Sequence, residues 1–284
     1  MATNRWLERR VLAYAHQGGA REAPSSTLYA LRKAVEAGAH ALELDVHATA
    51  DGHLVVCHDE TVDRTTDGSG AIGSLTLDEL RRLDNAYWWV PGEQVVHGLG
   101  PDAYPLRGRA PEDRELGIAT LREVLEAFPT TILNLDIKAT APAVVPYEQA
   151  LADLLREYER TDDVIVASFW DTATDAFSFI APEIPTSMGT LATAAFYQAV
   201  QAGESPASTR HVALQVPPQH SGLTIVDERF VTVAHEQGVA VHVWTIDDVA
   251  QMEAMVDLDV DGIISDRPTA LVDVLRRRDV AWPG

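Results

Sequence analysis

Short apolar, β-branched runs alternate with amphipathic stretches along most of the chain. Apolar runs of roughly four to eight residues between helix-like stretches are typical of repeated β–α units around a parallel sheet. Eight runs fit this description: Val11–His16, Ala41–His47, Thr131–Lys138, Val164–Phe169, Pro185–Thr190, Val212–Val216, Ala240–Ile246 and Gly262–Asp266. They predict a closed (β/α)8 TIM barrel of the α/β class, which we expect to occupy residues 1–284 as one domain.

Helix signals lie between these runs, with one long interruption. Thr27 precedes the amphipathic run Leu28–Glu36, and Gly38 supplies the stop. Thr120–Phe128 has the spacing of a capping box at the start of a helix. About eighty residues separate the second predicted strand from the third. We therefore predict a loop-rich insertion after the second strand, at about residues 61–117.

The second predicted strand continues into a hairpin that gathers ionisable groups. Asp51 and Gly52 suit a two-residue type I′ turn, which requires positive φ at both positions. That turn would set Asp45 opposite His58. Glu43 lies two residues before Asp45 and so shares its face of the strand. We expect two carboxylates and one histidine at the end of this strand.

Neighbouring strands add further polar groups at the same end of the barrel. The third predicted strand carries Asn134, Asp136 and Lys138 at a period of two, and the first strand ends in His16. Barrel enzymes build their active sites from the carboxyl ends of the strands. These residues, with Glu43 and its strand neighbours, are therefore expected to converge.

Three carboxylates in one barrel mouth repel each other unless a cation or a raised pKa relieves them. Glu43, Asp45 and Asp136 form an oxygen-only set, which suits a hard divalent cation, Mg²⁺ or Ca²⁺. His16 and His58 beside such a site suit general acid and base roles, because imidazole titrates near neutral pH. Surface ion pairs for the acids, and structural roles for the histidines, are the alternatives.

Four further groups of residues remain, and three of them have two possible interpretations. Lys138 either pairs with Asp136 or holds an anionic phosphate. Trp244 either packs inside the barrel or walls the pocket, and we favour the pocket. The aromatic run Tyr87–Trp89 either covers the pocket or holds the insertion together. The histidines at 47, 53 and 97 are expected to be surface or loop groups.

The net charge and the cysteine content limit the kinds of binding partner and cellular compartment that we expect. The chain has 43 acidic residues against 22 basic ones, for a formal net charge of −21. Such a chain lacks the basic face that nucleic acids and anionic membranes require. Cys57 is the only cysteine, which excludes an internal disulfide and suits a reducing compartment. No run is long enough for a membrane span or a signal-peptide core, so we expect a cytoplasmic protein unless a leader has been removed.

Several sequence motifs together resemble those of the glycerophosphodiester phosphodiesterases. The resemblance covers nearly the whole chain and rests on Ala15–Gly19, Glu22–Leu28, Ala34–Ala39, Leu42–His47, Asp51–Thr61, Asp63–Thr66, Val243–Thr245 and Val260–Pro268. It implies a (β/α)8 barrel with an insertion after the second strand. It also implies hydrolysis of small glycerophosphodiesters to glycerol 3-phosphate and an alcohol.

The resemblance assigns roles to the candidate residues. It implies that His16 and His58 are the acid–base pair, and that Lys138 contacts the phosphate. Glu43, Asp45 and Asp136 would bind one divalent metal ion, Mg²⁺ or Ca²⁺, and Trp244 would wall the pocket. The resemblance leaves the alcohol, the identity of the metal and the oligomeric state undetermined.

Departures from the family pattern leave alternatives open. Gln17 stands where an arginine is usual and would contact the phosphate without a charge. Ser25 and Ser26 replace a Glu-Asn pair, Asp136 replaces a glutamate, and Asp247 replaces a frequent asparagine. A related lyase or phospholipase-type cleavage that stops at a cyclic phosphate is one alternative function. A weakly catalytic protein that binds metal or phosphate is another.

Overall fold

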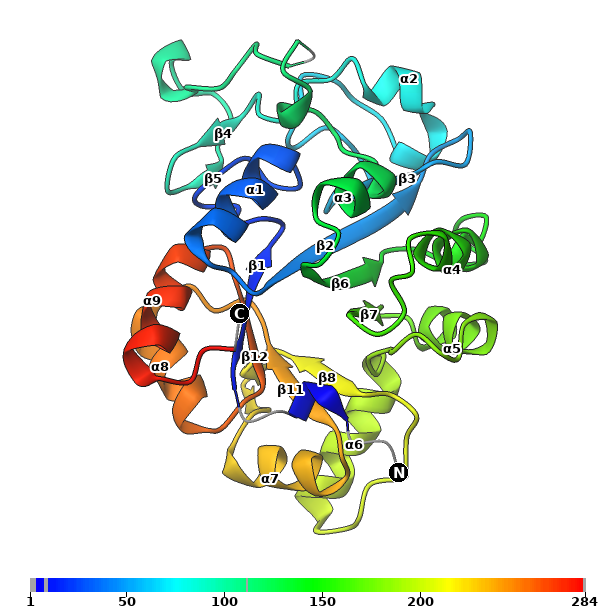
Figure 1. Cartoon of the computed structure of the whole chain (residues 1–284), viewed down its shortest axis with the longest axis vertical. Helices are drawn as coiled ribbons and strands as arrows, with labels where there is room; N and C mark the ends of the chain where they lie inside the picture. Colours follow the sequence, from blue (N-terminus) through cyan, green and yellow to red (C-terminus); the bar gives the residue numbers. More distant parts are fainter. Residues whose placement is uncertain (1–3, 8–9, 111, 283–284) are drawn as a thin grey trace.

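A computed structural model describes residues 4–7, 10–110 and 112–282. Within them, seven parallel strands follow one another in the order β7, β6, β2, β1, β12, β11, β8. Helices pack around the outside of these strands (Figure 1). The strands are β1 (Leu12–His16), β2 (Ala41–Ala48), β6 (Ile132–Ile137), β7 (Val164–Ala167), β8 (Ala213–Val216), β11 (Ala240–Val243) and β12 (Gly262–Ser265). Each lies within a predicted apolar run or overlaps it, so the predicted parallel β–α units are confirmed.

The remaining predicted strand, Pro185–Thr190, is shorter than expected but closes the barrel. Its central residues bridge the two ends of the sheet. The Ser187 N–H donates to the Val166 carbonyl of β7 at 3.0 Å, and the Met188 N–H donates to the Ala213 carbonyl of β8 at 3.0 Å. Helix α6 already begins at the last residue of the run, so no regular strand forms.

Helices α1 and α3 begin at their predicted capping residues. The Thr27 hydroxyl accepts from the Ala30 N–H, and Gly38 ends α1 with a φ of 100°. Thr120 and Glu123 form the predicted capping box of α3. The helices that follow the barrel strands are α1 (Leu28–Ala37), α3 (Leu121–Ala127), α4 (Glu148–Glu157), α5 (Asp171–Ile180), α6 (Thr190–Ala202), α7 (Glu228–Glu236), α8 (Val249–Asp257) and α9 (Pro268–Arg278).

The hairpin between β2 and β3 (Leu54–Val56) differs from its prediction by one residue. Of Asp51 and Gly52, only Gly52 has a positive φ, 82°. The Gly52 N–H donates to the Thr49 carbonyl at 3.0 Å, which is the arrangement of a three-residue loop with a left-handed third residue. The extra loop residue shifts the register, so Asp45 lies opposite Cys57 instead of His58. The strand β3 ends at Val56, and His58 lies two residues beyond it.

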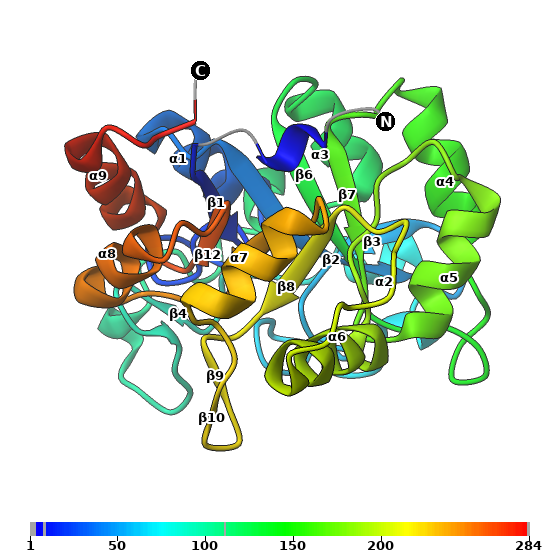
Figure 2. The ribbon, with the colours of Figure 1, turned by 90° about the horizontal axis from the view of Figure 1, so that it is seen from below.

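The insertion after β3 consists of short elements with small cores of their own. Its elements include α2 (Leu77–Leu80), β4 (Trp89–Val90), β5 (Gln94–Val95) and the 3-10 turns Ile72–Ser74, Pro101–Ala103 and Arg114–Leu116. The Arg107 guanidinium lies 3.5 to 4.5 Å from the ring centroids of Tyr87, Trp88 and Tyr104. Tyr87 and Trp88 therefore hold the insertion together. The smaller hairpin β9 (Gln219–His220) to β10 (Leu223–Thr224) projects after β8 (Figure 2).

The barrel interior changes from apolar to polar along its axis. Trp6, Tyr14 and apolar residues from β6, β7, β8 and β12 fill the end where the strands begin. Nearer the middle, the side-chain amides of Asn134 and Gln215 exchange two hydrogen bonds of 3.2 and 2.8 Å across the barrel. Asn134 is paired in register with Glu43, so this amide pair borders the predicted site.

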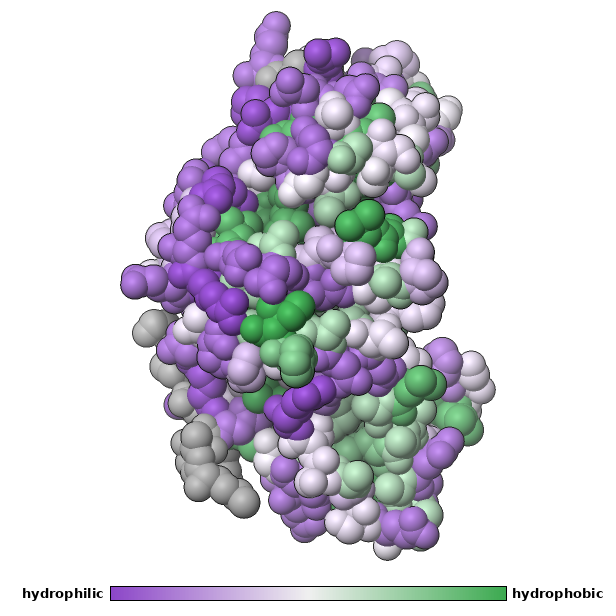
Figure 3. All heavy atoms as spheres, turned by 90° about the vertical axis from the view of Figure 1, so that its right-hand side faces the viewer, coloured by the Kyte–Doolittle hydropathy of each residue, from purple (hydrophilic) through white to green (hydrophobic). Residues whose placement is uncertain are grey.

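The surface is largely hydrophilic, with separate hydrophobic patches on the side of α4, α5 and α6 (Figure 3). Phe179 of α5 and Leu191 of α6 are exposed there. None of the helices in the described part of the chain is long and apolar enough to cross a membrane.

His242 on β11 makes the stability of the barrel sensitive to acid. Its side chain is fully buried, its Nδ1 lies 3.4 Å from the Tyr14 hydroxyl, and burial lowers its pKa from 6.5 to about 3. Below pH 6.5 the unfolded chain therefore binds a proton that the folded chain excludes, and stability falls as the pH falls.

We predict that His242→Leu flattens this loss between pH 6.5 and 4.5. The expected difference in slope is up to about 1.4 kcal/mol per pH unit, because one group titrates only in the unfolded state. Urea unfolding at several pH values measures the slope, and the exposed His220 provides the matched control as His220→Leu. Equal slopes in all three proteins would refute a neutral buried His242.

Candidate active site at the carboxyl ends of the strands

Parallel strand register brings the predicted polar residues together in layers. His16 of β1 pairs with Glu43 of β2, and Glu43 pairs with Asn134 of β6. One step further along the barrel axis, Asp45 pairs with Asp136. Because side chains alternate along a strand, these residues share the inner face of the barrel. The three carboxylates are buried within a few strand positions of each other.

His16 is held by an aspartate on its outer side. Its Nδ1 lies 2.7 Å from Asp266 Oδ1, and its Nε2 lies 3.7 Å from Glu43 Oε2. Burial lowers the pKa of His16, but the hydrogen bond to Asp266 and the charge of Glu43 outweigh burial and raise it to about 9. The Asp266 bond directs Nε2 toward the carboxylates. The orientation of His16 Nε2 is therefore fixed by the bond that Nδ1 makes on the opposite side of the ring.

His58 has a similar arrangement on the other side of the mouth. Its Nδ1 lies 2.7 Å from Asp59 Oδ1, and its ring centroid lies 6.0 Å from that of His16. Arg64 donates to both Asp59 oxygens, at 2.5 and 3.1 Å. Burial raises the pKa of Asp59, but the bonds from His58 and Arg64 outweigh burial and hold it well below its usual value. Asp59 is thus a fixed negative charge that orients His58.

Lys138 partly neutralises the three acids. Its Nζ lies 3.1 Å from Asp45 Oδ1 and 3.3 Å from Asp136 Oδ2. Burial, followed by the charge of Asp45, raises the pKa of Glu43 to about 8. Burial also raises the pKa of Asp136 to about 6, although the Lys138 ammonium opposes the shift. One ammonium is therefore not enough to keep all three acids readily ionised.

The same acids offer oxygen atoms that a hard cation could use. Glu43 Oε2 and Asp45 Oδ2 are buried and lack a hydrogen-bond partner, which is costly for a carboxylate oxygen. Among the described residues, however, no group of three or more histidine, cysteine or carboxylate side chains is arranged to hold a metal ion. Lys138 lies between Asp45 and Asp136 instead. The donor set fits Mg²⁺ or Ca²⁺ in chemistry, provided that the side chains move closer together.

Gln17 and Trp244 lie near these groups in different ways. The Gln17 amide nitrogen lies 3.0 Å from His16 Nε2, and Gln17 is buried with a φ of 53°. Its N–H can donate to a neutral imidazole, or its turned amide oxygen can accept from an imidazolium. The Trp244 ring packs edge-on against Phe169 at 5.6 Å, and the Lys138 ammonium lies 5.9 Å from the Phe169 centroid. Phe169 is 54% exposed, whereas Trp244 is half-buried and also packs against the apolar cluster inside the barrel.

Two of the three histidines predicted to be surface or loop groups are exposed, and the third is not. His53 and His97 are exposed, as predicted, but His47 is only 6% exposed. It follows Asp45 by two residues on β2 and therefore lies on the same inner face of the strand. The period of two along β2 places His47 on the same face as Glu43 and Asp45, so the sequence could have predicted its inward position.

Sequence reasoning also missed the aspartates that hold the two histidines. Asp266 ends the eighth predicted strand, and Asp59 directly follows His58, so both lay inside the motifs that carry the resemblance. Asp247, noted only as a departure from the family pattern, accepts from the Asp266 N–H at 2.8 Å and from the Arg21 Nε–H at 3.0 Å. No local sequence pattern pairs residues about 250 positions apart, such as His16 and Asp266.

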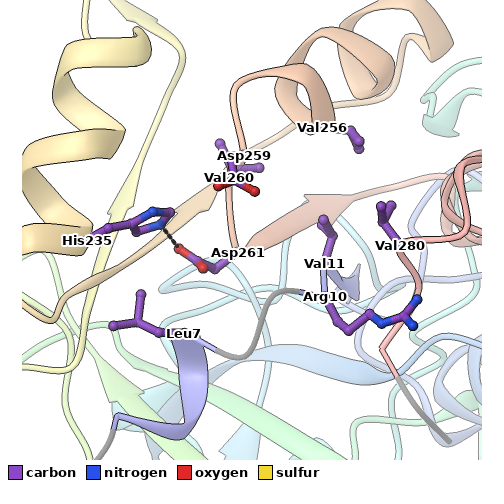
Figure 4. Close-up of a pocket in the computed structure, with 9 residues that line it drawn as sticks. All are labelled: Leu7, Arg10, Val11, His235, Val256, Asp259, Val260, Asp261 and Val280. Atoms are coloured by element: carbon purple, nitrogen blue, oxygen red, sulfur yellow. Dashed lines mark hydrogen bonds and ion pairs between the residues drawn. The ribbon is translucent and has the colours of Figure 1, made fainter.

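A separate pocket of about 270 Å³ opens at the other end of the barrel, where the strands begin (Figure 4). Four valines and Leu7 line it together with ionisable groups, among which His235 is paired to Asp261 at 2.9 Å. Asp261 also accepts from the Val241 N–H at 2.7 Å. In barrels of this type, the end where the strands begin contributes to stability and the opposite end carries the chemistry. The candidate site is therefore the carboxylate and histidine cluster.

Comparison with protein families and known proteins agrees with the geometry. The sequence model of the Glycerophosphoryl diester phosphodiesterase family matches residues 16–270. A glycerophosphodiester phosphodiesterase of Caldanaerobacter subterraneus subsp. tengcongensis is 31% identical over 270 residues, which are 94% of this chain and 99% of that protein. A Bacillus subtilis glycerophosphodiester phosphodiesterase is 27% identical and covers 91% of this chain and 84% of its own length.

Solved structures share the fold at low identity. The glycerophosphoryl diester phosphodiesterase domain of a Mycobacterium tuberculosis protein has a TM-score of 0.76 at 20% identity, covering 94% of this chain and 99% of its own. A phosphodiesterase of Oleispira antarctica, solved with the product sn-glycerol-3-phosphate, has a TM-score of 0.67 at 21% identity, covering 95% and 99%. At these identities the likeness establishes the barrel fold.

The buried acids give a stability prediction that does not depend on turnover. Because burial raises the pKa of Glu43 to about 8, folding at pH 7 must protonate a carboxylate that is ionised in the unfolded chain, and this costs folding free energy. Glu43→Gln should therefore stabilise the chelator-treated protein by roughly 1–3 kcal/mol. Unfolding in urea with EDTA measures this change, and Glu36→Gln on exposed α1 surface is the control. Destabilisation by Glu43→Gln would mean that the carboxylate is favourably solvated or paired.

Proposed function

Because the chain belongs to the Glycerophosphoryl diester phosphodiesterase family and is a phosphoric diester hydrolase, we propose that it hydrolyses a small glycerophosphodiester to glycerol 3-phosphate and an alcohol. The main observation in support of this proposal is the pair of neighbouring histidines. His16 and His58 lie 6.0 Å apart, centroid to centroid, and each is held through Nδ1 by its own aspartate. Because the two rings lie edge to face at this short distance, both imidazoles would act on one phosphate group at the mouth.

We propose that Glu43, Asp45 and Asp136 hold one divalent cation, Mg²⁺ or Ca²⁺. The unpartnered oxygens of Glu43 and Asp45 support this, since a cation would satisfy them. When bound, the ion would supply Lewis-acid stabilisation of the phosphoryl oxygens and would acidify a nearby hydroxyl. It would also relieve the repulsion that raises the pKa of Glu43.

Lys138 and Gln17 would bind the phosphate. Although burial lowers the pKa of Lys138, the charges of Asp45 and Asp136 raise it above its usual value, so the ammonium keeps its charge. A cation bound by those acids would release Nζ for a phosphoryl oxygen. Gln17 would add a neutral N–H donor beside His16 Nε2. Phe169 and Trp244 would wall the pocket on the side of Lys138.

The histidines would move protons in two stages. In the first, one imidazole accepts the proton of the glycerol hydroxyl next to the phosphate, and that oxygen attacks phosphorus. The other imidazolium donates its proton to the departing alkoxide, which leaves as the alcohol. In the second stage the roles reverse, and water opens the cyclic phosphate to glycerol 3-phosphate. Asp266 and Asp59 stabilise whichever ring is charged at each stage.

The charge of the whole chain restricts the substrate to small molecules. With a formal charge of −21, the surface repels nucleic acids, so the favourable region for a phosphate is the mouth with Lys138 and a cation. The product complex of the Oleispira antarctica phosphodiesterase supports a small phosphate ester as the ligand. The buried Cys57, whose pKa burial raises to about 12, is suited to a reducing compartment such as the cytoplasm.

The proposal predicts metal-dependent turnover. Purified protein with Mg²⁺ or Ca²⁺ should release choline from glycerophosphocholine or ethanolamine from glycerophosphoethanolamine, and chelation should stop the release. His16→Ala and His58→Ala should each lower kcat by about 10²–10⁴-fold, the usual contribution of one acid–base group. The exposed His53 provides the control as His53→Ala. Undiminished release after chelation, or from His16→Ala, would contradict the mechanism.

The two-stage scheme also predicts the product. Phosphorus NMR of a completed reaction should show glycerol 3-phosphate as the only final phosphate, with cyclic phosphate at most transient. Cyclic phosphate that accumulates and persists would identify the related lyase. Binding of glycerophosphocholine without any turnover would identify a binding protein instead.

A further inference from the structure

The inserted hairpin of β4 and β5 reaches the aspartate that holds His16. The side-chain amide of Gln94 on β5 donates a short hydrogen bond to Asp266 Oδ2, and Asp266 Oδ1 lies 2.7 Å from His16 Nδ1. The two oxygens of one carboxylate thus join the insertion to the histidine. Asp266 is only 4% exposed, so few other donors can compete for Oδ2.

The backbone of Asp266 is fixed separately from its carboxylate. Its N–H donates to Asp247 Oδ1 at 2.8 Å, and the same Asp247 oxygen accepts from the Ser265 hydroxyl at 3.1 Å. These bonds fix the main chain but leave the side-chain rotation free. The orientation of the carboxylate is therefore set by His16 on one oxygen and Gln94 on the other.

Other bonds already attach the hairpin to the barrel. The Gly92 N–H donates to the Arg21 carbonyl at 2.9 Å, and Arg21 returns a bond to the Gly92 carbonyl at 3.1 Å. The Trp89 indole N–H donates to the Ala20 carbonyl at 3.0 Å. The hairpin thus has three attachments besides Gln94, so the Gln94 amide is not required merely to hold it in place.

The backbone at Gln94 argues for a role of its side chain. Its φ is 75°, in the left-handed region that glycine adopts readily and that costs other residues of order 1 kcal/mol. Glycine would relieve this cost but would supply no amide. Glutamine occupies this unfavourable backbone conformation, and its side-chain amide reaches Asp266. The contact with Asp266 is therefore a reason for a glutamine at this position.

We propose that Gln94 is a positioning residue for catalysis, through which the insertion fixes the Asp266 carboxylate and hence the orientation of His16. This inference rests on the proposed role of His16 in proton transfer. Gln94 itself does not touch the substrate. Its loss should leave substrate binding intact and lower the rate at which a correctly oriented imidazole transfers a proton.

The test compares variants of nearly equal shape in the full chain. Gln94→Met keeps the length of the side chain and removes the amide, whereas Gln94→Glu places a carboxylate against Asp266. Glu93→Gln changes an exposed residue of the same turn and is the matched control. Thermal unfolding of each protein checks that the hairpin and barrel still fold.

For glycerophosphocholine with Mg²⁺ or Ca²⁺, Gln94→Met should lower kcat by about tenfold with KM changed less than about twofold, the effect of losing one bond to a charged group. Gln94→Glu should lower kcat further, because like charges repel. Glu93→Gln should match the parent protein. Unchanged kcat in Gln94→Met, or a loss confined to KM, would overturn the proposal.

A double-mutant cycle separates positioning from a general structural effect. If Gln94 acts through Asp266, then Gln94→Met should change kcat less than about twofold in an Asp266→Asn background. A full tenfold loss in that background would overturn the proposal, since it would mean that Gln94 acts by another route.

Nitrogen NMR of the imidazole gives a readout that does not require turnover. The His16 signals, assigned by their loss in His16→Ala, should indicate protonation at Nδ1 in the parent protein and a changed Nδ1 signal in Gln94→Met. If the parent protein does not turn over any glycerophosphodiester, the proposed function fails, and an unchanged His16 signal in Gln94→Met then refutes the positioning role as well. Turnover that His16→Ala abolishes but Gln94→Met leaves intact refutes the positioning role alone.

Discussion

The structure depends on the cost of placing three carboxylates in a barrel mouth. Glu43, Asp45 and Asp136 lie on paired positions of adjacent strands, so the register that closes the barrel also forces them together. Water cannot screen them, because all three are buried. Neighbouring basic groups reduce the repulsion between the acids. Lys138 bridges Asp45 and Asp136, and His16 lies beside Glu43. A protein selected for stability alone would have little reason to retain such a cluster.

Two histidine–aspartate pairs with the same arrangement flank this cluster. Each histidine gives Nδ1 to an aspartate, and each aspartate is itself held by a further group, Arg64 on one side and Gln94 on the other. The two dyads differ in what supports them. Arg64 brings a positive charge to Asp59, whereas Gln94 brings a neutral amide to Asp266. The negative charge of Asp266 is therefore left uncompensated by its support, which contributes to the raised pKa of His16.

Strand periodicity was enough to predict most of the barrel and the convergence of His16, Glu43 and Asp136. The prediction of each strand needed only local apolar patterning, and parallel register then fixed which residues became neighbours. It failed where the outcome depended on one backbone angle: Asp51 does not adopt positive φ, so the hairpin gained a loop residue and Asp45 lost His58 as its partner. It also missed Gln94, because a contact with Asp266 across 172 residues leaves no periodic trace.

The amide pair of Asn134 and Gln215 affects the electrostatics of the site that it borders. Each amide both donates and accepts, so the pair spans the barrel with these two hydrogen bonds and adds no net charge. Asn134 lies beside Glu43 in the strand register, so the acid borders on a neutral group that neither takes up nor releases a proton near neutral pH. Protonation, cation binding or phosphate binding in the mouth changes the charge of the acids and histidines, whereas this neighbour of Glu43 stays neutral.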